Sequence, residues 1–119
     1  MLNLDTHVLI HALTDNVTPA EKKILSQDAW SISGIVLWEI YKLHQIGRIE
    51  LEISKSEFQQ IISNIHIWNL DLRVFKALSK LDFKSDPANE IIAATSLAYN
   101  IPLLTRDKKS KKSKIVPLA

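Results

Sequence analysis

The first ten residues place an acid between a predicted strand and a predicted helix. Leu2–Leu4 is a short apolar segment with strand character, and the apolar pattern continues as a helix to about Leu13. Asp5 stands at the junction. Open sheets of parallel strands bind ligands beyond the carboxyl ends of their strands. Asp5 is therefore predicted to lie at a ligand-binding edge, and capping of the following helix is the simpler alternative.

Short apolar segments and helical patterns alternate along the rest of the chain. The predicted strands are Leu2–Leu4, Trp30–Ser33, Ile65–Leu70 and Asn100–Leu104, with Ile115–Leu118 as a last edge strand. Helical patterns occupy most of the sequence between them. This alternation is typical of βαβ units and predicts an α/β fold, with a parallel sheet covered by helices on both faces.

Several predicted helix boundaries carry recognisable signals. Ser54 and Glu57 fit the S-x-x-E capping box and predict a helix through Asn64. Gly47 is predicted to end the helix that begins at Gly34. The other predicted N-caps are Thr18 before Pro19, Asp71, and Asp86 before Pro87.

The composition limits the class of protein. With 119 residues the chain can build one hydrophobic core, so residues 1–119 are predicted to form a single domain. It contains no cysteine, which excludes disulfides, thiolate metal sites and a cysteine nucleophile. The sequence has neither an apolar stretch of roughly 20 residues nor a basic leader, and a cytoplasmic location is therefore expected.

Positive charge is concentrated in one late segment. The net charge is only +2, but Arg106 and the lysines between positions 108 and 114 put six cations into nine residues. Such a block is either a solvated segment or an anion-binding surface. Its position beside Asp107 supports the anion-binding alternative.

Glu39 is an acid on the apolar side of a predicted helix. Ile35 and Leu43 lie one helical turn away on either side. Helical side chains lean toward the helix N-terminus, which directs this carboxylate toward the carboxyl edge of the sheet. A carboxylate on a core face is costly unless it is paired or binds a cation. Pairing with Lys42 or Arg48 is the alternative.

Three further polar residues fall at similar edges. Asp107 follows the strand predicted over Asn100–Leu104 and could equally be a turn acid. Asp86 is well explained as the N-cap before Pro87. Asn89 lies in the first turn of the same helix and, from its spacing to Ile92, faces inward. Each has a simple explanation alone, but polar residues gathered at one sheet edge are hard to attribute to capping.

The chemistry of such a cluster points to a metal ion. Neighbouring carboxylates repel one another, and a hard divalent cation relieves that repulsion. Mg²⁺ and Mn²⁺ prefer oxygen ligands and retain several waters. Ions of this kind can activate water and stabilise an in-line displacement at phosphorus. With Arg106 and Lys108 placed to hold a phosphate backbone, the pattern predicts metal-dependent phosphodiester hydrolysis.

Four segments resemble the PIN-domain family, and in particular its VapC-type toxins of toxin–antitoxin modules. They are Leu4-Asp5-Thr6, Ser33 with Trp38-Glu39-Ile40, Asp86-Pro87-Ala88-Asn89 through Ala94, and Leu104-Thr105-Arg106-Asp107. The resemblance covers essentially the whole chain. It implies a three-layer α/β/α sandwich with a central parallel sheet and Mg²⁺- or Mn²⁺-dependent endoribonuclease activity. It also implies homodimerisation and neutralisation by a small antitoxin protein.

The resemblance also assigns roles to single residues. Asp5, Glu39 and Asp107 match the family's acidic positions, and Asn89 stands where the family has another acid. These four are the implied metal ligands, and Asp5, Glu39, Asp86 and Asp107 are the implied catalytic acids. The candidates for substrate binding are Thr6, Ser33, Thr105, Arg106 and Lys108.

Asn89 is a departure from the family pattern. An asparagine can ligate a metal through its carbonyl oxygen but brings no negative charge, so weaker metal binding is expected. Asp86 lies on roughly the same side of the helix and is expected to substitute in part. The alternative is a catalytically weakened PIN-fold module that binds RNA or an antitoxin without cleaving.

The remaining motifs favour ordinary structural roles. His7 and His11 have the spacing of a zinc pair but lack the glutamate of H-E-x-x-H, so packing or surface roles are expected. Trp30, Trp38 and Trp68 are expected in the core, with base stacking by one of them as the alternative.

Overall fold

A parallel sheet forms the centre of the structure. The computed structural model describes residues 1–49 and 51–119. Within these residues the strands are β1 (Leu2–Leu4), β2 (Trp30–Ser33), β3 (His66–Trp68) and β4 (Leu103–Leu104), in the order β3-β2-β1-β4. All their pairings are parallel, as predicted. Because β1 is an inner strand, its carboxyl end is flanked by the ends of β2 and β4.

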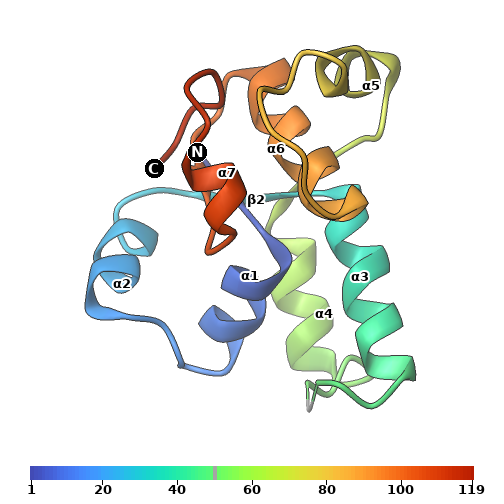
Figure 1. Ribbon diagram of the computed structural model, residues 1–119. Helices are drawn as coiled ribbons and strands as arrows, with labels where there is room; N and C mark the ends of the chain where they lie inside the picture. The colour runs from blue at the N-terminus through green and yellow to red at the C-terminus, as the bar shows by residue number, and fades with distance from the viewer. Residues whose placement is uncertain (50) are drawn as a thin grey trace.

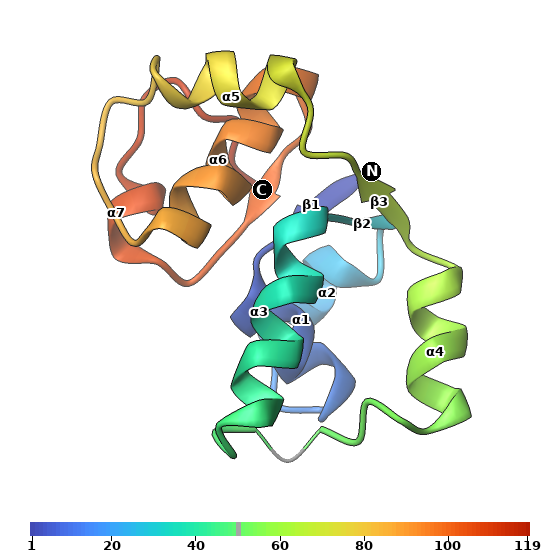
Figure 2. The ribbon, with the colours of Figure 1, turned by 90° about the vertical axis from the view of Figure 1, so that its right-hand side faces the viewer.

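Helices cover both faces of the sheet, which confirms the three-layer α/β/α sandwich. They are α1 (Thr6–Leu13), α2 (Pro19–Leu25), α3 (Gly34–Gln45), α4 (Ser56–Ser63), α5 (Leu72–Leu78), α6 (Pro87–Tyr99) and α7 (Lys108–Lys111). In Figures 1 and 2, α5 and α6 lie above the strands and α1 to α4 lie below them. Among the described residues, no helix combines the length and apolar character needed to span a bilayer.

Most helix boundaries follow the signals in the sequence. Thr18 caps α2 in a reciprocal capping box with Glu21, and Asp71 accepts a hydrogen bond from the Val74 backbone at the start of α5. Gly47 follows α3 with a φ of +70°, a left-handed conformation that favours glycine. Local chemistry therefore sets where these helices begin and end.

The capping box predicted at Ser54 and Glu57 is wrong. Helix α4 begins at Ser56, and Lys55 occupies the N-cap position without a side-chain capping hydrogen bond. The Lys55 backbone N–H donates to the carbonyl of Glu52 at 3.2 Å, which closes a turn just before the helix. Because this turn delays the helix by one residue, Ser54 precedes the N-cap position and does not cap the helix.

The last part of the chain also differs from expectation. The strand predicted over Ile115–Leu118 contributes one parallel bridge, between Leu118 and Leu103. Asp82 accepts hydrogen bonds from the Ser113 hydroxyl at 2.6 Å and the Lys114 backbone at 2.8 Å, which makes this segment turn rather than extend. The lysine block just before it forms helix α7.

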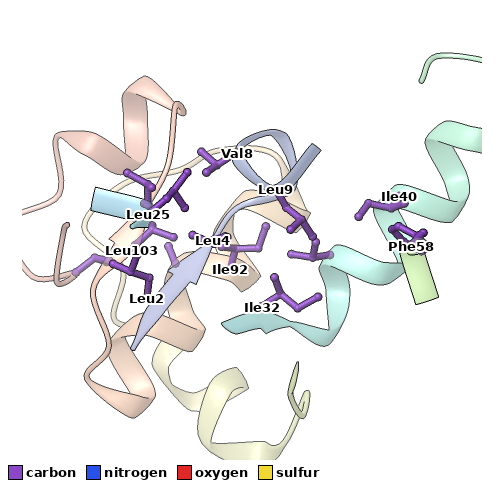
Figure 3. Packing of buried hydrophobic residues seen from close by; sticks show 14 of the residues in the cluster. Leu2, Leu4, Val8, Leu9, Leu25, Ile32, Ile40, Phe58, Ile92 and Leu103 are labelled. Atoms are coloured by element: carbon purple, nitrogen blue, oxygen red, sulfur yellow. The ribbon is translucent and has the colours of Figure 1, made fainter. Parts of the chain in front are cut away.

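The hydrophobic core lies between the sheet and the helices on both of its faces (Figure 3). Leu4 of β1 and Ile32 of β2 are fully enclosed. Leu9 and Ile40 pack against them from α1 and α3, and Ile92 closes the other face from α6. This packing fixes the ends of β1 and β2 relative to the start of α6.

A small polar network crosses this apolar core. The Asn3 side-chain amide donates to the Ile92 carbonyl at 3.1 Å and to the Ser96 hydroxyl at 2.9 Å. On the neighbouring strand, the Ser31 hydroxyl donates to the Leu2 carbonyl at 2.6 Å and accepts from the Trp68 indole at 2.8 Å. Buried polar groups that find partners in this way fix the register between elements.

The expectation for the tryptophans is wrong for one of the three. Trp30 and Trp68 are partly buried, but the Trp38 residue is 59% exposed. Val36 and Ile40 of the same helix face the core. Trp38 lies midway between them in sequence and therefore projects from the opposite side of α3.

Candidate active site

Strand register brings three of the predicted site residues to one level of the sheet. β1 pairs in parallel with both β2 and β4. Following these registers to the strand ends places Asp5 level with Ser33 on one side and Thr105 on the other. All three are buried. The carboxyl edge of the sheet is thus polar at its centre, as the sequence predicts.

Asp5 is a buried carboxylate that accepts three hydrogen bonds. Its Oδ1 accepts from the Val8 backbone at 2.7 Å, which caps α1. Its Oδ2 accepts from the Arg106 backbone at 3.1 Å and from the Thr105 hydroxyl. The side chain therefore joins β1 to the segment after β4. Asp5 both caps α1 and lies at the carboxyl edge of the sheet, so the two predicted alternatives hold together.

Asp107 is fixed by serines on two sides. Its Oδ2 accepts from the Ser110 hydroxyl at 2.6 Å, the Ser110 backbone at 3.1 Å and the Ser85 hydroxyl at 3.2 Å. Partial burial acts to raise the pKa of Asp107, but these hydrogen bonds outweigh it and hold the pKa below its ordinary value. The carboxylate is therefore ionised, and it also caps α7.

One cavity brings together the residues of three chain segments. It has a volume of about 320 Å³ and is lined by Asp5, His7, His11, Asn89, Arg106 and Asp107, and we refer to it as the site cavity. Asn89 comes from the first turn of α6, where its amide donates to the Ser85 hydroxyl at 3.4 Å. Asp5, Asn89 and Asp107, three of the predicted metal ligands, therefore share one space.

Glu39 lies next to this cavity rather than on its wall. Its Oε1 accepts a hydrogen bond from the hydroxyl of Thr6, the residue directly after Asp5. Among the described residues it forms no ion pair with Lys42 or Arg48, the partners that the simpler explanation requires. Through Thr6, Glu39 is the acid that α3 contributes to this edge of the sheet.

Two of the predicted residues lie outside the site cavity and are exposed. Asp86 occupies the N-cap position of α6, but its side chain makes no capping hydrogen bond there. Lys108 is exposed at the start of α7. Ser33 is buried and accepts a hydrogen bond from the Ile35 backbone at 3.4 Å, which caps α3.

Arg106 has a partner that the sequence did not reveal. Its Nε donates to Glu21 Oε2 at 2.8 Å, and one terminal nitrogen donates to Glu21 Oε1 at 2.6 Å and to the Asn16 carbonyl at 3.2 Å. The hydrogen bonds from this guanidinium lower the pKa of Glu21 from 4.5 to about 2. Glu21 therefore neutralises much of the positive charge that Arg106 brings to the site cavity.

The two histidines are a second feature that sequence reasoning missed. His7 and His11, one turn apart on α1, line the site cavity, where packing or general surface roles were expected. His7 is exposed, and His11 Nδ1 is buried with no hydrogen-bond partner among the described residues. Their positions two and six residues after Asp5 were the signal available in the sequence.

The donor set fits a hard divalent cation in its chemistry. Asp5 and Asp107 bring carboxylate oxygens to the site cavity, and Asn89 brings an amide oxygen. Mg²⁺ and Mn²⁺ favour oxygen donors of these kinds. In the described parts of the chain, no three His, Cys, Asp or Glu side chains are grouped closely enough to hold a metal ion.

A parallel α/β/α sandwich with acids at the carboxyl edge defines the class of fold, and a family model identifies it. The chain belongs to the PIN domain family, whose model matches residues 3–114. The chain matches no curated protein sequence.

Solved structures with the same fold are distant in sequence. A chain of the VapBC2 complex of Rickettsia felis, bound to a promoter DNA fragment, is 18% identical with a TM-score of 0.73, covering 100% of this chain and 98% of its own. A chain of a toxin–antitoxin complex from Klebsiella pneumoniae is 18% identical with a TM-score of 0.74, covering 100% and 97%. A chain of FitAcB from Neisseria gonorrhoeae is also 18% identical, with a TM-score of 0.65 and coverage of 92% and 90%.

Proposed function

We propose that this PIN-domain protein is a Mg²⁺- or Mn²⁺-dependent endoribonuclease and the toxin of a toxin–antitoxin pair. One observation carries the proposal: Asp5, Asn89 and Asp107, from the beginning, the later part and the end of the domain, line one cavity at the carboxyl edge of a parallel sheet. Ligands of α/β sheets bind at this edge. Oxygen donors from distant segments gathered there are better explained by a shared ligand than by two separate helix caps and an asparagine with a contact of its own.

Asp5, Asn89 and Asp107 would hold the metal ion, with Glu39 as a further acid beside them. Bound there, Mg²⁺ or Mn²⁺ would act as a Lewis acid toward a phosphodiester group. The protein keeps the two aspartates fixed before any ligand arrives, through Thr105 on one side and Ser110 on the other. Preorganised ligands of this kind lose little conformational entropy when a cation binds.

Two kinds of protein partner follow from the proposal. The solved structures with this fold include toxin–antitoxin complexes, which supports an antitoxin as the inhibitor of this chain. Helix α3 exposes Trp38 at 59% and Tyr41 at 45%, and exposed aromatic residues are typical of protein interfaces. This supports a contact with the antitoxin or with a second copy of the chain in a homodimer.

Asn89 favours a second candidate function. Its neutral amide leaves the site cavity one negative charge short of the acid that the PIN resemblance implies at this position. A catalytically weakened PIN module that binds RNA or an antitoxin without cleaving is the alternative. Asp86 does not fill the gap in this conformation, because it is exposed outside the cavity.

The test is RNA cleavage with Mg²⁺ or Mn²⁺ by wild type, Asp5→Asn and Asn89→Asp. Asp5→Asn is expected to lower the cleavage rate at least about 100-fold, because a fixed charge in the reaction site is lost. Asp15→Asn is the matched control, since Asp15 is exposed and its φ of 56° suits asparagine. Its rate should equal that of wild type.

The outcomes separate the two candidate functions. Equal cleavage by wild type and a folded Asp5→Asn variant would exclude the proposed site. No cleavage by wild type, together with cleavage by Asn89→Asp, would establish the weakened module instead. Circular dichroism of each variant shows whether a lost rate reflects chemistry or an unfolded chain.

A further inference from the structure

Helix α7 carries an unbalanced positive charge beside the site cavity. Its lysines Lys108, Lys109 and Lys111, and Lys112 directly after them, are all exposed. None of the four forms an ion pair with a carboxylate among the described residues. Figure 2 shows α7 at the outer side of the molecule, next to α6. We call these four residues the lysine face.

The geometry of α7 directs all four lysines away from the protein. Ser110, in the middle of the helix, is 1% exposed and hydrogen-bonded to Asp107. At about 100° of rotation per residue, the lysines fill an arc of roughly 160° centred opposite Ser110. The helix is therefore held by one small polar residue on its inner side and is entirely cationic on its outer side.

Clustering these charges is unfavourable without an anionic partner. Lys108 and Lys112 are spaced i, i+4, where like charges destabilise a helix. The two nearest acids, Asp107 and Asp82, do not form ion pairs with these lysines among the described residues, because their oxygens accept hydrogen bonds from hydroxyl and backbone groups. An anion from outside the chain would relieve this repulsion.

The other cation of this region is already committed. The Arg106 guanidinium is bound by Glu21 and the Asn16 carbonyl, although Arg106 lines the site cavity. Arg106 also lines a neighbouring hollow of about 660 Å³, to which Lys111 contributes. The free positive charge next to the reaction site is therefore carried by the lysines.

We infer that the lysine face binds the phosphate backbone of single-stranded RNA beside the bond to be cut. This inference rests on the proposed nuclease function and adds the surface along which its substrate lies. The first lysine follows Asp107 directly, and Lys111 lines the hollow that shares Arg106 with the site cavity, so a strand held by α7 would lie beside that cavity. A helix with its side chains is about 10 Å wide. For a single strand whose bases stay stacked, at about 3.4 Å per phosphate, this width covers roughly three phosphates.

The experiment measures RNA binding as a function of salt. An end-labelled single-stranded RNA oligonucleotide is titrated with the protein in EDTA, so that binding is read by fluorescence anisotropy without cleavage. Wild type is compared with a variant carrying Lys108→Gln, Lys109→Gln, Lys111→Gln and Lys112→Gln. Glutamine removes the charge and has a helix propensity close to that of lysine. Each variant is melted beside wild type, and the four-fold variant is expected to melt at the same or a higher temperature.

Loss of three phosphate contacts should lower the slope of log affinity against log salt by about 2, at ~0.7 for each phosphate. If wild type and the four-fold variant bind RNA equally at about 1 M salt, this difference in slope makes the variant bind about 100-fold more weakly at about 0.1 M. The matched control compares Lys108→Gln/Lys112→Gln with Lys76→Gln/Lys80→Gln, an exposed pair of equal spacing on and just after α5. The control pair should leave the slope unchanged.

Three results would overturn the inference: no RNA binding by wild type, an unchanged slope in the four-fold variant, or an equal loss in the control pair. An oligoglutamate peptide of the same charge is a second probe. Equal sensitivity of peptide and RNA binding would assign the lysine face to an acidic protein partner instead. If wild type cleaves RNA but the four-fold variant has the same salt slope, the nuclease proposal holds and the lysine face is not its RNA surface. If RNA binding depends on the lysines but wild type does not cleave, the RNA surface is supported and the nuclease proposal is refuted.

Discussion

Asn3 and Asp5 stand two residues apart along β1, and both are polar side chains enclosed by the fold. Asn3 donates its hydrogen bonds into the core, to the carbonyl of Ile92 and the hydroxyl of Ser96 on α6. Asp5 accepts its hydrogen bonds at the strand end, from backbone and side chains of two other segments, and it lines the site cavity. The Asn3 side chain connects the sheet to α6. The Asp5 side chain connects the end of β1 to the segment after β4, beside the site cavity.

The difference shows that burial of a polar group does not by itself indicate a functional role. Both residues are almost without solvent contact, so both side chains lose the hydrogen bonds that water would supply. Asn3 meets that cost for its amide nitrogen with neutral partners inside the apolar core, whereas its buried Oδ1 has no hydrogen-bond partner among the described residues. Asp5 is a charge whose neighbours, Asn89 and Asp107, face the same cavity. The presence of other donors around a shared space is what separates a candidate ligand from a structural side chain.

The largest effect that tests this comparison is expected from Asn3→Ala. The change removes two hydrogen bonds to α6 and leaves a cavity in the core, which should lower the free energy of unfolding by about 3 kcal/mol. Denaturant unfolding measures the loss. Asn69→Ala, at an exposed position after β3, is the control and should change stability by less than about 0.5 kcal/mol.

The Asn3→Ala variant also tests whether Asn3 has a purely structural role. Under conditions in which Asn3→Ala is fully folded, its rate of RNA cleavage per molecule should equal that of wild type. A reduced rate in the folded variant would mean that Asn3 also sets the geometry of the site, and the division between the two positions would fail.

A smaller effect tests the role of the site cavity around Asp5. Asn89→Asp adds a carboxylate to the site cavity and should tighten Mn²⁺ binding about 10-fold, which corresponds to about 1.4 kcal/mol. Isothermal titration calorimetry measures the dissociation constant. Asn69→Asp makes the same chemical change outside the cavity and should leave the affinity as it is. Equal gains in both variants would show a general effect of charge rather than a ligand at position 89.

The smallest predicted effect concerns Glu21. Its folded pKa of about 2 lies below 4.5, so its stabilising contribution is fully present above pH 4.5 and disappears as the pH falls through 2. Glu21→Gln should therefore be less stable than wild type by about 1 kcal/mol at pH 7, a value at the upper end for pairs near the surface. Unfolding curves recorded at about pH 7, 4.5 and 2 should show this difference largely kept at the first two values and clearly smaller at the last. A difference that stays constant over this range would exclude the Arg106 pairing as its source.

The parallel sheet and the edge residues could be predicted because their signals are local. Asp5, Asn89 and Asp107 each stand beside a recognisable strand end or helix start, and parallel strands bring such positions to one edge. Glu39 was found by its helical spacing. In each case a few neighbouring residues predict the position, and the parallel topology brings these positions to the same edge of the sheet.

The unpredicted features depend on contacts between distant residues. Glu21 and Arg106 are 85 positions apart, and the capping box at Thr18 already gave Glu21 a sufficient local explanation. Helix α7 is four residues long, which is too short to show a helical period, and its stability comes from the burial of Ser110 against Asp107. Ser85 and Ser110 gave no signal in the sequence, because a serine that orients a carboxylate looks like any other serine.

The hydrogen bond between Thr105 and Asp5 spans 100 positions of sequence, and this has a consequence for the newly made protein. Ribosomes add roughly 5 to 20 residues per second, so about 5 to 20 s separate the synthesis of the two partners. During that interval Asp5 exists without the segment that completes its surroundings. A growing chain thus contains Asp5 well before it contains Arg106 and Asp107, the last residues that line the site cavity. The complete cavity can form only when translation of the domain is almost finished.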